Sequence, residues 1–218
     1  MAEVDLLRAL PKTKRNIEKR KEAKDPAVVA IAKQYGEMYW DGPREYGYGG
    51  YKYDGRWRPV ARDIIAHFGL KPGDRVLDVG CGKGFVVKDL MLECSGLEAF
   101  GLDVSLYAIT HAPEELTGRL HLGTGERLPF PDDSFDCVLS LNTIHNFPRP
   151  RAIKAMQEIQ RVSGGSAFVQ VDSYLTPEQK EIFESWVLTA EFHDYPDGWV
   201  KLFEEAGYTG DYYWTIIE

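Results

Sequence analysis

The pattern of apolar positions changes character near residue 71. From there on, short apolar runs typical of buried strands alternate with stretches whose apolar residues recur every three or four positions, as on one face of a helix. Strands are predicted at 75–80, 98–105, 119–125, 135–143, 166–173 and 208–218. Helices are predicted at 57–69, 86–94, 149–162, 177–192 and 196–206. This alternation predicts an α/β fold, a doubly wound and mostly parallel sheet with helices on both faces.

The first 56 residues follow a different pattern. Residues 1–38 are charged and carry helical spacing, interrupted by Pro11 and Pro26. Residues 39–57 then read YWDGPREYGYGGYKYDGRW, with five tyrosines, two tryptophans and five glycines on no regular period. Such a stretch is typical of neither a core helix nor a core strand. We expect two parts, an arm and lid at 1–56 and a domain at 57–218.

The composition narrows the class of protein. A chain of 218 residues, 44% hydrophobic and 28% charged, is typical of one soluble globular domain. Its net charge of −8 argues against nucleic-acid binding, and no apolar run approaches the roughly 20 residues of a membrane span. The first residues lack the order of a secretory signal, and the three cysteines do not have zinc or disulfide spacing. We therefore expect a cytoplasmic protein without a metal; monomer and dimer both remain open.

A basic run extends from Lys12 to Lys24 and is the local exception to the acidic composition. Two interpretations are open. The run could be a solvated helical arm, or it could contact an acidic partner.

The most specific motif is VLDVGCGKGF at residues 76–85. It places Asp78, Gly80, Gly82 and Gly84 between a strand and a helix, where glycines let a ligand approach the backbone. A dinucleotide fingerprint needs another glycine spacing, with Phe85 in place of the last glycine, and a P-loop needs a Gly-Lys-Ser/Thr ending. Asp103 closes the second strand and can accept hydrogen bonds from both hydroxyls of a ribose. The motif therefore predicts a pocket for a nucleoside without a pyrophosphate.

These motifs, together with GLDVS, GTGERLPFPDDSFDCVLS and FEEAGY, resemble those of the class I S-adenosylmethionine-dependent methyltransferases across roughly residues 57–218. The resemblance implies a seven-stranded sheet and S-adenosylmethionine as the cofactor, with S-adenosylhomocysteine as the product. It implies that the glycine turn faces the methionine part, Asp103 the ribose, and the loop after the third strand the adenine. The implied cofactor-binding residues are Asp78, Gly80, Cys81, Gly82, Gly84, Asp103, Val104, Thr124, Gly125, Glu126 and Leu141. Relatives usually carry an acid in place of Thr124.

The methyl acceptor is expected beyond the fourth strand, in LNTIHNF. His145 is a candidate general base because its ordinary pKa is near 6.5; the alternative is that it positions substrate or caps the next helix. Asn146 stands where similar sequences often carry a second histidine. Asp172 is a second candidate facing the pocket, with a loop hydrogen bond as its alternative role, and His193 with Asp194 would reach the pocket only if their loop folds inward.

The aromatic–glycine stretch is the expected source of acceptor specificity. Its tyrosines offer rigid contact area and attract cations, and its glycines allow it to bend over a ligand. Arg44 or Arg56 could bind a carboxylate on the cofactor or the acceptor. The alternative is a loop whose aromatic side chains fill the gap between arm and core. The expected substrate-binding residues are Arg44, Tyr46, Tyr48, Tyr51, Asn142, Asn146 and Asp172.

The sequence thus predicts a methyltransferase that acts on an oxygen of a small or medium-sized acceptor. A sugar or metabolite hydroxyl, or a carboxylate such as a peptide C-terminus, fits this expectation. Two alternatives remain open: N-methylation of a small molecule, and a non-catalytic protein that only binds S-adenosylmethionine or serves as a scaffold.

Overall fold

A parallel sheet forms the centre of the molecule. The computed structural model describes residues 1–11 and 15–217, and within them the sheet has six strands in the order β3-β2-β1-β4-β5-β6, every neighbouring pair parallel. The strands are β1 (Arg75–Val79), β2 (Glu98–Asp103), β3 (Leu120–Leu122), β4 (Cys137–Leu141), β5 (Ala167–Ser173) and β6 (Asp211–Ile216). The strand order reverses between β1 and β4, so the carboxyl ends of these two strands frame the position where such sheets bind ligands.

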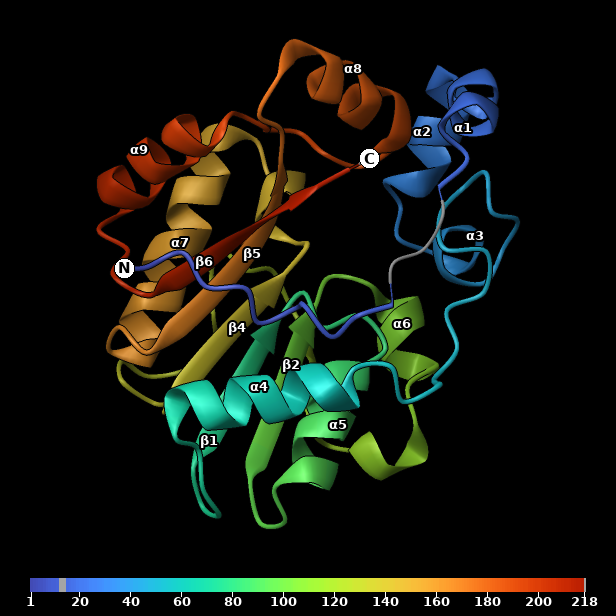
Figure 1. The fold of residues 1–218 in the computed structure, drawn as a ribbon. Helices are drawn as coiled ribbons and strands as arrows, with labels where there is room; N and C mark the ends of the chain where they lie inside the picture. Colours follow the sequence, from blue (N-terminus) through green and yellow to red (C-terminus); the bar gives the residue numbers. More distant parts are fainter. Residues whose placement is uncertain (12–14, 218) are drawn as a thin grey trace.

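Helices cover both faces of this sheet (Figure 1). The helices are α4 (Arg58–Phe68), α5 (Phe85–Glu93), α6 (Leu106–Thr110), α7 (Arg149–Ser163), α8 (Pro177–Trp186) and α9 (Pro196–Ala206), with short 3₁₀ turns η1 (Glu114–Leu116) and η2 (Ile144–Asn146). One core cluster joins α7 and α9 to the sheet, and a second joins α4 and α5 to it. The doubly wound α/β prediction is therefore confirmed, and Gly69 ends α4 in the left-handed conformation as its position predicts.

The sheet edge at β6 differs from the expected seven strands. β6 pairs in parallel with β5 over six residues, and its other edge is bordered by the start of the chain. The backbone of Tyr212 receives a hydrogen bond from Val4 N–H (2.9 Å) and donates one to Ala2 (3.0 Å). The described residues therefore contain six strands, and the first residues border the edge where a further strand would pair.

The N-terminal residues contain no helix up to residue 10: Glu3 pairs with Tyr212 of β6, and residues 8–9 form a turn. Leu6 and Leu7 are buried in the core cluster on the α4 side of the sheet, which explains why these residues follow the sheet instead of forming a helix. Figure 1 shows this segment in blue, running from β6 toward the side of the molecule where α1, α2 and α3 lie. These three helices are α1 (Ile17–Ala23), α2 (Pro26–Ala32) and α3 (Glu37–Trp40).

The described part of the basic run lies on α1 and at its two ends, and it is only partly solvated. Arg20 is buried and donates to the backbone carbonyls of Glu45 (2.7 Å) and Gly47 (3.3 Å). Lys24 donates to the carbonyl of Val187 (2.7 Å), just beyond α8. Lys12 and Lys14 lie outside the described residues. The solvated-arm interpretation therefore does not apply to Arg20, whose charge faces the protein.

The predicted helix at 177–192 ends early, at Trp186. Glu191 and Phe192 instead donate their backbone N–H groups to the carbonyl of His145, at 2.9 and 3.1 Å. The chain after α8 is thereby held against η2, at the carboxyl end of β4. Among the described residues, no helix combines the length and the apolar character needed to cross a membrane.

Candidate active site

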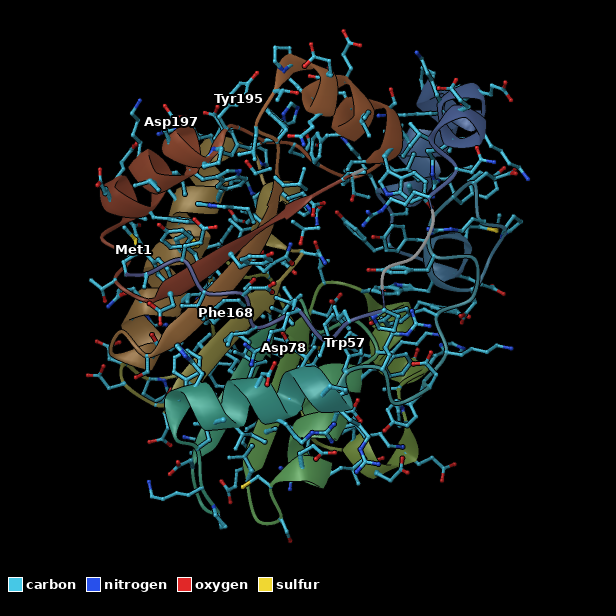
Figure 2. The ribbon with its side chains drawn as sticks, viewed as in Figure 1. Met1, Trp57, Asp78, Phe168, Tyr195 and Asp197 are labelled. Carbon is cyan, nitrogen blue, oxygen red and sulfur yellow. The ribbon has the colours of Figure 1, made fainter. Side chains whose placement is uncertain are left out.

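A small cavity of about 40 Å³ lies at the carboxyl ends of β1 and β4. It is lined by Trp40, Tyr48, Tyr51, Trp57, Asp78, Gly80, Cys81, Gly82, Val86, Leu141 and Asn142. Figure 2 shows Trp57 and Asp78, two of these residues, near the centre of the molecule beside α4. The cavity therefore joins the glycine turn, the end of β4 and the aromatic–glycine stretch.

The glycine turn needs its glycines for two physical reasons. Gly80 and Gly82 have φ angles of +85° and +55°, which side chains rarely adopt. A Cβ atom on Gly80 would lie 2.0 Å from Oγ1 of Thr143, and one on Gly82 would lie 2.7 Å from the ring of Trp40. A side chain at either position would therefore clash with Thr143 or Trp40.

Asp103 holds the turn in place from the end of β2. Its carboxylate accepts hydrogen bonds from the backbone N–H groups of Gly82 and Ser105, both at 2.7 Å. Burial raises its pKa, although these N–H groups oppose the shift. Each carboxylate oxygen has a second lone pair, so Asp103 can still accept further hydrogen bonds.

Asp78 is a buried carboxylate with an unused oxygen. Within the described part of the chain, its Oδ1 atom has no hydrogen-bond partner. Burial raises the pKa of Asp78 to about 7, and the neighbouring charge of Asp103 contributes to the shift. An unpaired buried carboxylate is costly, so a cationic or hydrogen-bond-donating group at this position would be stabilised.

Residues 39–57, which we call the aromatic segment, pack directly on the glycine turn. The Trp40 indole N–H donates to Ser105 Oγ and to the carbonyl of Tyr35, both at 2.9 Å. Tyr48 stacks on Trp40 with ring centroids 5.2 Å apart, and Tyr51 stacks on Phe85 at 4.6 Å. A row of aromatic rings therefore covers the mouth of the turn.

An ion pair fixes the aromatic segment to the turn. The buried ammonium group of Lys83 lies 2.6 Å from Oδ2 of Asp41, and the Tyr107 hydroxyl donates to the same oxygen at 3.0 Å. Burial alone would raise the pKa of Asp41, but the hydrogen bonds from Lys83 and Tyr107 hold it below its ordinary value. Lys83 therefore connects the glycine turn to the segment that covers it.

Some residues expected to bind substrate lie elsewhere. Tyr46 does not line the cavity and packs with Val28, Ala32 and Leu188, in a separate small cluster under α2. Arg56 forms an exposed pair with Asp54 at 2.6 Å, so of the two arginines proposed as anion binders Arg56 is already engaged. The positions of Tyr46 and Arg56 depend on how the arm packs. The spacing of residues in the sequence does not predict this packing.

The loop after β3 is held by α7. Glu126 accepts a bidentate pair of hydrogen bonds from Arg151, and the Thr124 hydroxyl donates to Glu126 at 3.2 Å. Gly125 is buried against Val79 and Phe147. None of these three loop residues lines the cavity, and Val104 is exposed on the surface beside Asp103. Their role toward an adenine therefore stays a prediction.

His145 and Asp172 are both buried and in contact, and neither lines the cavity. The backbone N–H of Asp172 donates to Nδ1 of His145 at 3.3 Å. A ring nitrogen that accepts carries no proton, so the neutral imidazole is a donor at Nε2. Burial lowers the pKa of His145 and keeps it neutral, although Asp172 opposes the shift. This geometry does not support the base role expected for His145.

Asp172 is the carboxylate of this pair. Burial raises its pKa, and the nearby His145 and Arg15 oppose that shift. Tyr48 links it to the cofactor side of the site. Partial removal from water raises the pKa of the Tyr48 hydroxyl, and the carboxylates of Asp103 and Asp172 raise it further. The hydroxyl of Tyr48 thus lies within electrostatic reach of both carboxylates.

The remaining candidates have local partners. Asn146 donates from Nδ2 to the carbonyl of Asn142 at 3.1 Å, and Asn142 itself lines the cavity with a left-handed φ of 54°. His193 lies 2.9 Å from the Tyr174 hydroxyl and does not line the cavity, and neither does Asp194. Sequence reasoning missed Trp40, Trp57 and Val86. Trp40 and Trp57 belong to the aromatic stretch, but the sequence does not show that their rings face the cavity.

Comparison with known proteins agrees with this geometry. Residues 77–169 match the family described as "Methyltransferase domain". The chain is 35% identical over 116 residues to sterol 24-C-methyltransferase ERG6B of Gibberella zeae, covering 48% of this chain and 30% of the relative. It is 29% identical over 163 residues to 2-methyl-6-phytyl-1,4-hydroquinone methyltransferase of Synechocystis, covering 66% and 51%. The chain therefore spans about a third to a half of the length of these relatives.

A solved structure shares the arrangement of the sheet and its helices. A chain in the complex of the Haloferax volcanii Trm112 methyltransferase activator with a methyltransferase superposes with a TM-score of 0.57, at 25% identity, over 69% of this chain and 67% of that one. The fold, the glycine turn and these similarities define a nucleoside-binding doubly wound domain. Residues 77–169 therefore match a methyltransferase domain, and the chain has the fold of the class I S-adenosylmethionine-dependent methyltransferases.

S-adenosylmethionine, the cofactor of this family, fits the chemistry of the residues present. Asp103 retains acceptor capacity for ribose hydroxyls, and the unpartnered Oδ1 of Asp78 suits the ammonium group of the methionine part. A cavity of about 40 Å³ is, however, far smaller than the roughly 300 Å³ or more that a small-molecule site needs. The rings of Trp40, Tyr48 and Tyr51 would have to move outward to admit the cofactor.

Proposed function

We propose that this protein transfers a methyl group from S-adenosylmethionine to an oxygen atom of a small or medium-sized acceptor. One observation supports this most strongly: the cavity joins the glycine turn and the unpartnered Asp78 to the aromatic segment, whose Tyr48 lies near both Asp103 and Asp172. Cofactor-binding and acceptor-binding groups therefore share one site.

On the cofactor side, the chain would bind and orient. Asp103 would accept from the ribose hydroxyls, Asp78 would hold the ammonium group, and Leu141 would border the methionine part. When bound, the cofactor supplies an electrophilic methyl group on a sulfonium. Displacement at that carbon needs alignment of the nucleophile and exclusion of water more than it needs acid or base groups. The aromatic rings over the turn would exclude water.

On the acceptor side, Asp172 is the proposed proton acceptor for a hydroxyl. Its raised pKa brings it closer to neutrality than an exposed carboxylate, which suits general-base catalysis. His145, a donor at Nε2 when neutral, would orient the acceptor by a hydrogen bond. A carboxylate acceptor would need no base at all, and Asp172 would then be dispensable.

Carbon methylation is the second candidate, because the first of the relatives above is a sterol 24-C-methyltransferase. The two candidates differ in their products. An oxygen acceptor gives an ether or an ester, and the ester alone is cleaved by mild base. A carbon acceptor gives a product that resists both hydrolysis and ether cleavage.

The test is formation of S-adenosylhomocysteine by the full chain with a panel of sugars, phenols, carboxylic acids and sterols, each with an acceptor-free control. We expect acceptor-dependent product with a hydroxyl or carboxyl compound. Mass spectrometry after mild-base treatment distinguishes an ester from the other products, and mass spectrometry after ether cleavage distinguishes an ether from a carbon-methylated product. If S-adenosylhomocysteine binds but no acceptor supports turnover, the non-catalytic alternative is favoured.

A further inference from the structure

Three guanidinium groups converge on one indole ring beside the proposed acceptor side. The central guanidinium carbons of Arg20, Arg44 and Arg15 lie 4.9, 5.3 and 5.8 Å from the ring of Trp186. They come from α1, from the aromatic segment and from the chain just before α1, while Trp186 ends α8. Four separate parts of the arm and the α8 region thus build one cationic cluster.

Within the part of the chain that the structure describes, ion pairs do not offset the charge of this cluster. Across residues 1–11 and 15–217, none of the three arginines forms an ion pair with a carboxylate. Arg20 donates to the carbonyls of Glu45 and Gly47, and Arg44 also donates to Gly47. Removal from water lowers the pKa of both residues, and Arg44 lowers the pKa of Arg20 further, as Arg15 does for Arg44. The positive charges therefore repel one another at close range.

Such an arrangement is unfavourable unless something offsets it. Like charges held together destabilise a fold, whereas a guanidinium group has five N–H donors in a fork that fits oxyanions. Most of these donors are unused, since the carbonyl bonds above engage two groups of Arg20 and one of Arg44. Arg44 is exposed and Arg15 half-buried, so an anion in solution can reach them.

The cluster adjoins the groups assigned to the acceptor. Arg44 lies close enough to influence the pKa of Tyr48, and Arg15 close enough to influence the pKa of Asp172. Burial keeps the pKa of Asp172 raised, although Arg15 opposes this shift. The single carboxylate of Asp172 does not balance three arginines.

We propose that Arg15, Arg20 and Arg44, with Trp186, form a subsite for a doubly charged oxyanion of the phosphate class on the methyl acceptor. A dianion matches the excess of positive charge, whereas a single carboxylate would leave most of it uncompensated. The anion site stands on the cluster alone; its assignment to the acceptor rests on the proposed methyl transfer. The acceptor would then be a phosphorylated small molecule whose nucleophile lies toward Tyr48 and Asp172.

Inorganic phosphate is the probe, titrated calorimetrically into the full chain at low salt, with acetate as the singly charged comparison. We expect saturable phosphate binding that R15Q and R44Q each weaken about tenfold or more, since a charge-assisted hydrogen bond contributes that much. The matched control is R149Q. Arg149 also lies over an aromatic ring, Phe192 at 6.0 Å, but it is paired with Glu205. R149Q should leave phosphate affinity unchanged.

S-adenosylhomocysteine is titrated into the same four proteins. Its affinity should be equal in all of them, which also shows that the variants are folded. Unchanged phosphate affinity in R15Q and R44Q, no saturable binding, or acetate binding as tight as phosphate would each overturn the subsite. If the unmodified chain does not bind S-adenosylhomocysteine, the proposed function is contradicted. The phosphate titration still tests the anion subsite in that case.

Discussion

Two buried carboxylates beside the glycine turn differ in how well they are satisfied. Asp103 is held by backbone N–H groups at 2.7 Å, while one oxygen of Asp78 has no partner in the described part of the chain. The first arrangement stabilises the turn, and the second costs stability in return for an open binding position. Substitution of Asp103 should therefore weaken ligand binding, whereas substitution of Asp78 by an amide should stabilise the fold.

Asp103→Ala should weaken S-adenosylhomocysteine binding roughly 10- to 100-fold, because one or two hydrogen bonds to a charged acceptor are lost, worth about 1.5–3 kcal/mol. Isothermal titration calorimetry measures this directly. Glu98→Ala, at the exposed start of the same strand, is the control and should bind normally. Equal affinity in both variants would remove Asp103 from the ribose site.

Asp78→Asn should raise the free energy of unfolding at pH 8 and change it little near pH 4. The pKa of Asp78 is about 7 in the fold against an ordinary 3.8, so the folded state keeps a proton that the unfolded state has released. Stability therefore falls as pH rises through this window, and the full cost is present above about pH 7. The amide removes that cost. Urea unfolding at both pH values measures the difference.

Asp74→Asn is the control of opposite sign for this experiment. Hydrogen bonds from the backbone and side chain of Lys71 lower the pKa of Asp74, so its charge stabilises the fold at pH 8. Its replacement should lower stability there. A loss of stability in Asp78→Asn at pH 8 would mean that the carboxylate is paired, and the binding role assigned to its free oxygen would fail.

At the scale of elements, the aromatic segment covers the glycine turn and contributes Trp40, Tyr48, Tyr51 and Trp57 to the cavity lining. It packs on the glycine turn through Trp40, it is fixed by the Asp41–Lys83 ion pair, and Tyr53 donates to Asp89 of α5 at 2.5 Å. The composition of this stretch predicts a functional role for it. The composition does not show which rings face inward, because an irregular loop has no period from which a face can be read.

Tyr48→Phe should raise the KM for the acceptor roughly tenfold while leaving cofactor affinity within about twofold, since only the hydroxyl near Asp103 and Asp172 is lost. Steady-state kinetics with a working acceptor measures it. Tyr46→Phe is the control within the same segment, because Tyr46 packs under α2. If both variants kept the KM of the unmodified chain, the segment would act by packing alone.

The regular elements show which features of the fold could be predicted from local sequence signals and which depend on long-range packing. Helices α7 and α9 begin and end within a residue of expectation, because their apolar spacing and flanking glycines are local signals. The cofactor half of the site follows a local motif in the same way. The acceptor half depends on long-range packing: the hydrogen bond from Asp172 to His145, and the three arginines on Trp186, join residues far apart in sequence.

At the scale of the whole molecule, the start of the chain is part of the core. Residues 2–4 border β6, and Leu6 and Leu7 are buried with α4 and α5. Residues 2–7 thus pack on the sheet, while Trp40, Tyr48 and Tyr51 of the predicted arm and lid line the cavity.

Leu6→Ala should lower the free energy of unfolding by about 2–4 kcal/mol, because a buried leucine leaves a cavity when truncated. Chemical denaturation followed by fluorescence measures it. Leu122→Ala is the control, since Leu122 is 56% exposed, and it should change stability by less than about 0.5 kcal/mol. A Leu6→Ala effect no larger than that of Leu122→Ala would mean that the segment is only loosely attached.

The positively charged residues of α1 and its C-cap connect segments that should therefore exchange amide hydrogens together. Arg20 donates to carbonyls of the aromatic segment, and Lys24, the C-cap of α1, donates to the carbonyl of Val187 beyond α8. This seven-residue helix therefore connects the aromatic segment to the end of α8 through a few polar contacts. Such a helix has little intrinsic stability, and its opening would release both partners at once. Amide hydrogens of α1, the aromatic segment and the end of α8 should therefore exchange with solvent at a common rate, well before those of β1 and β4.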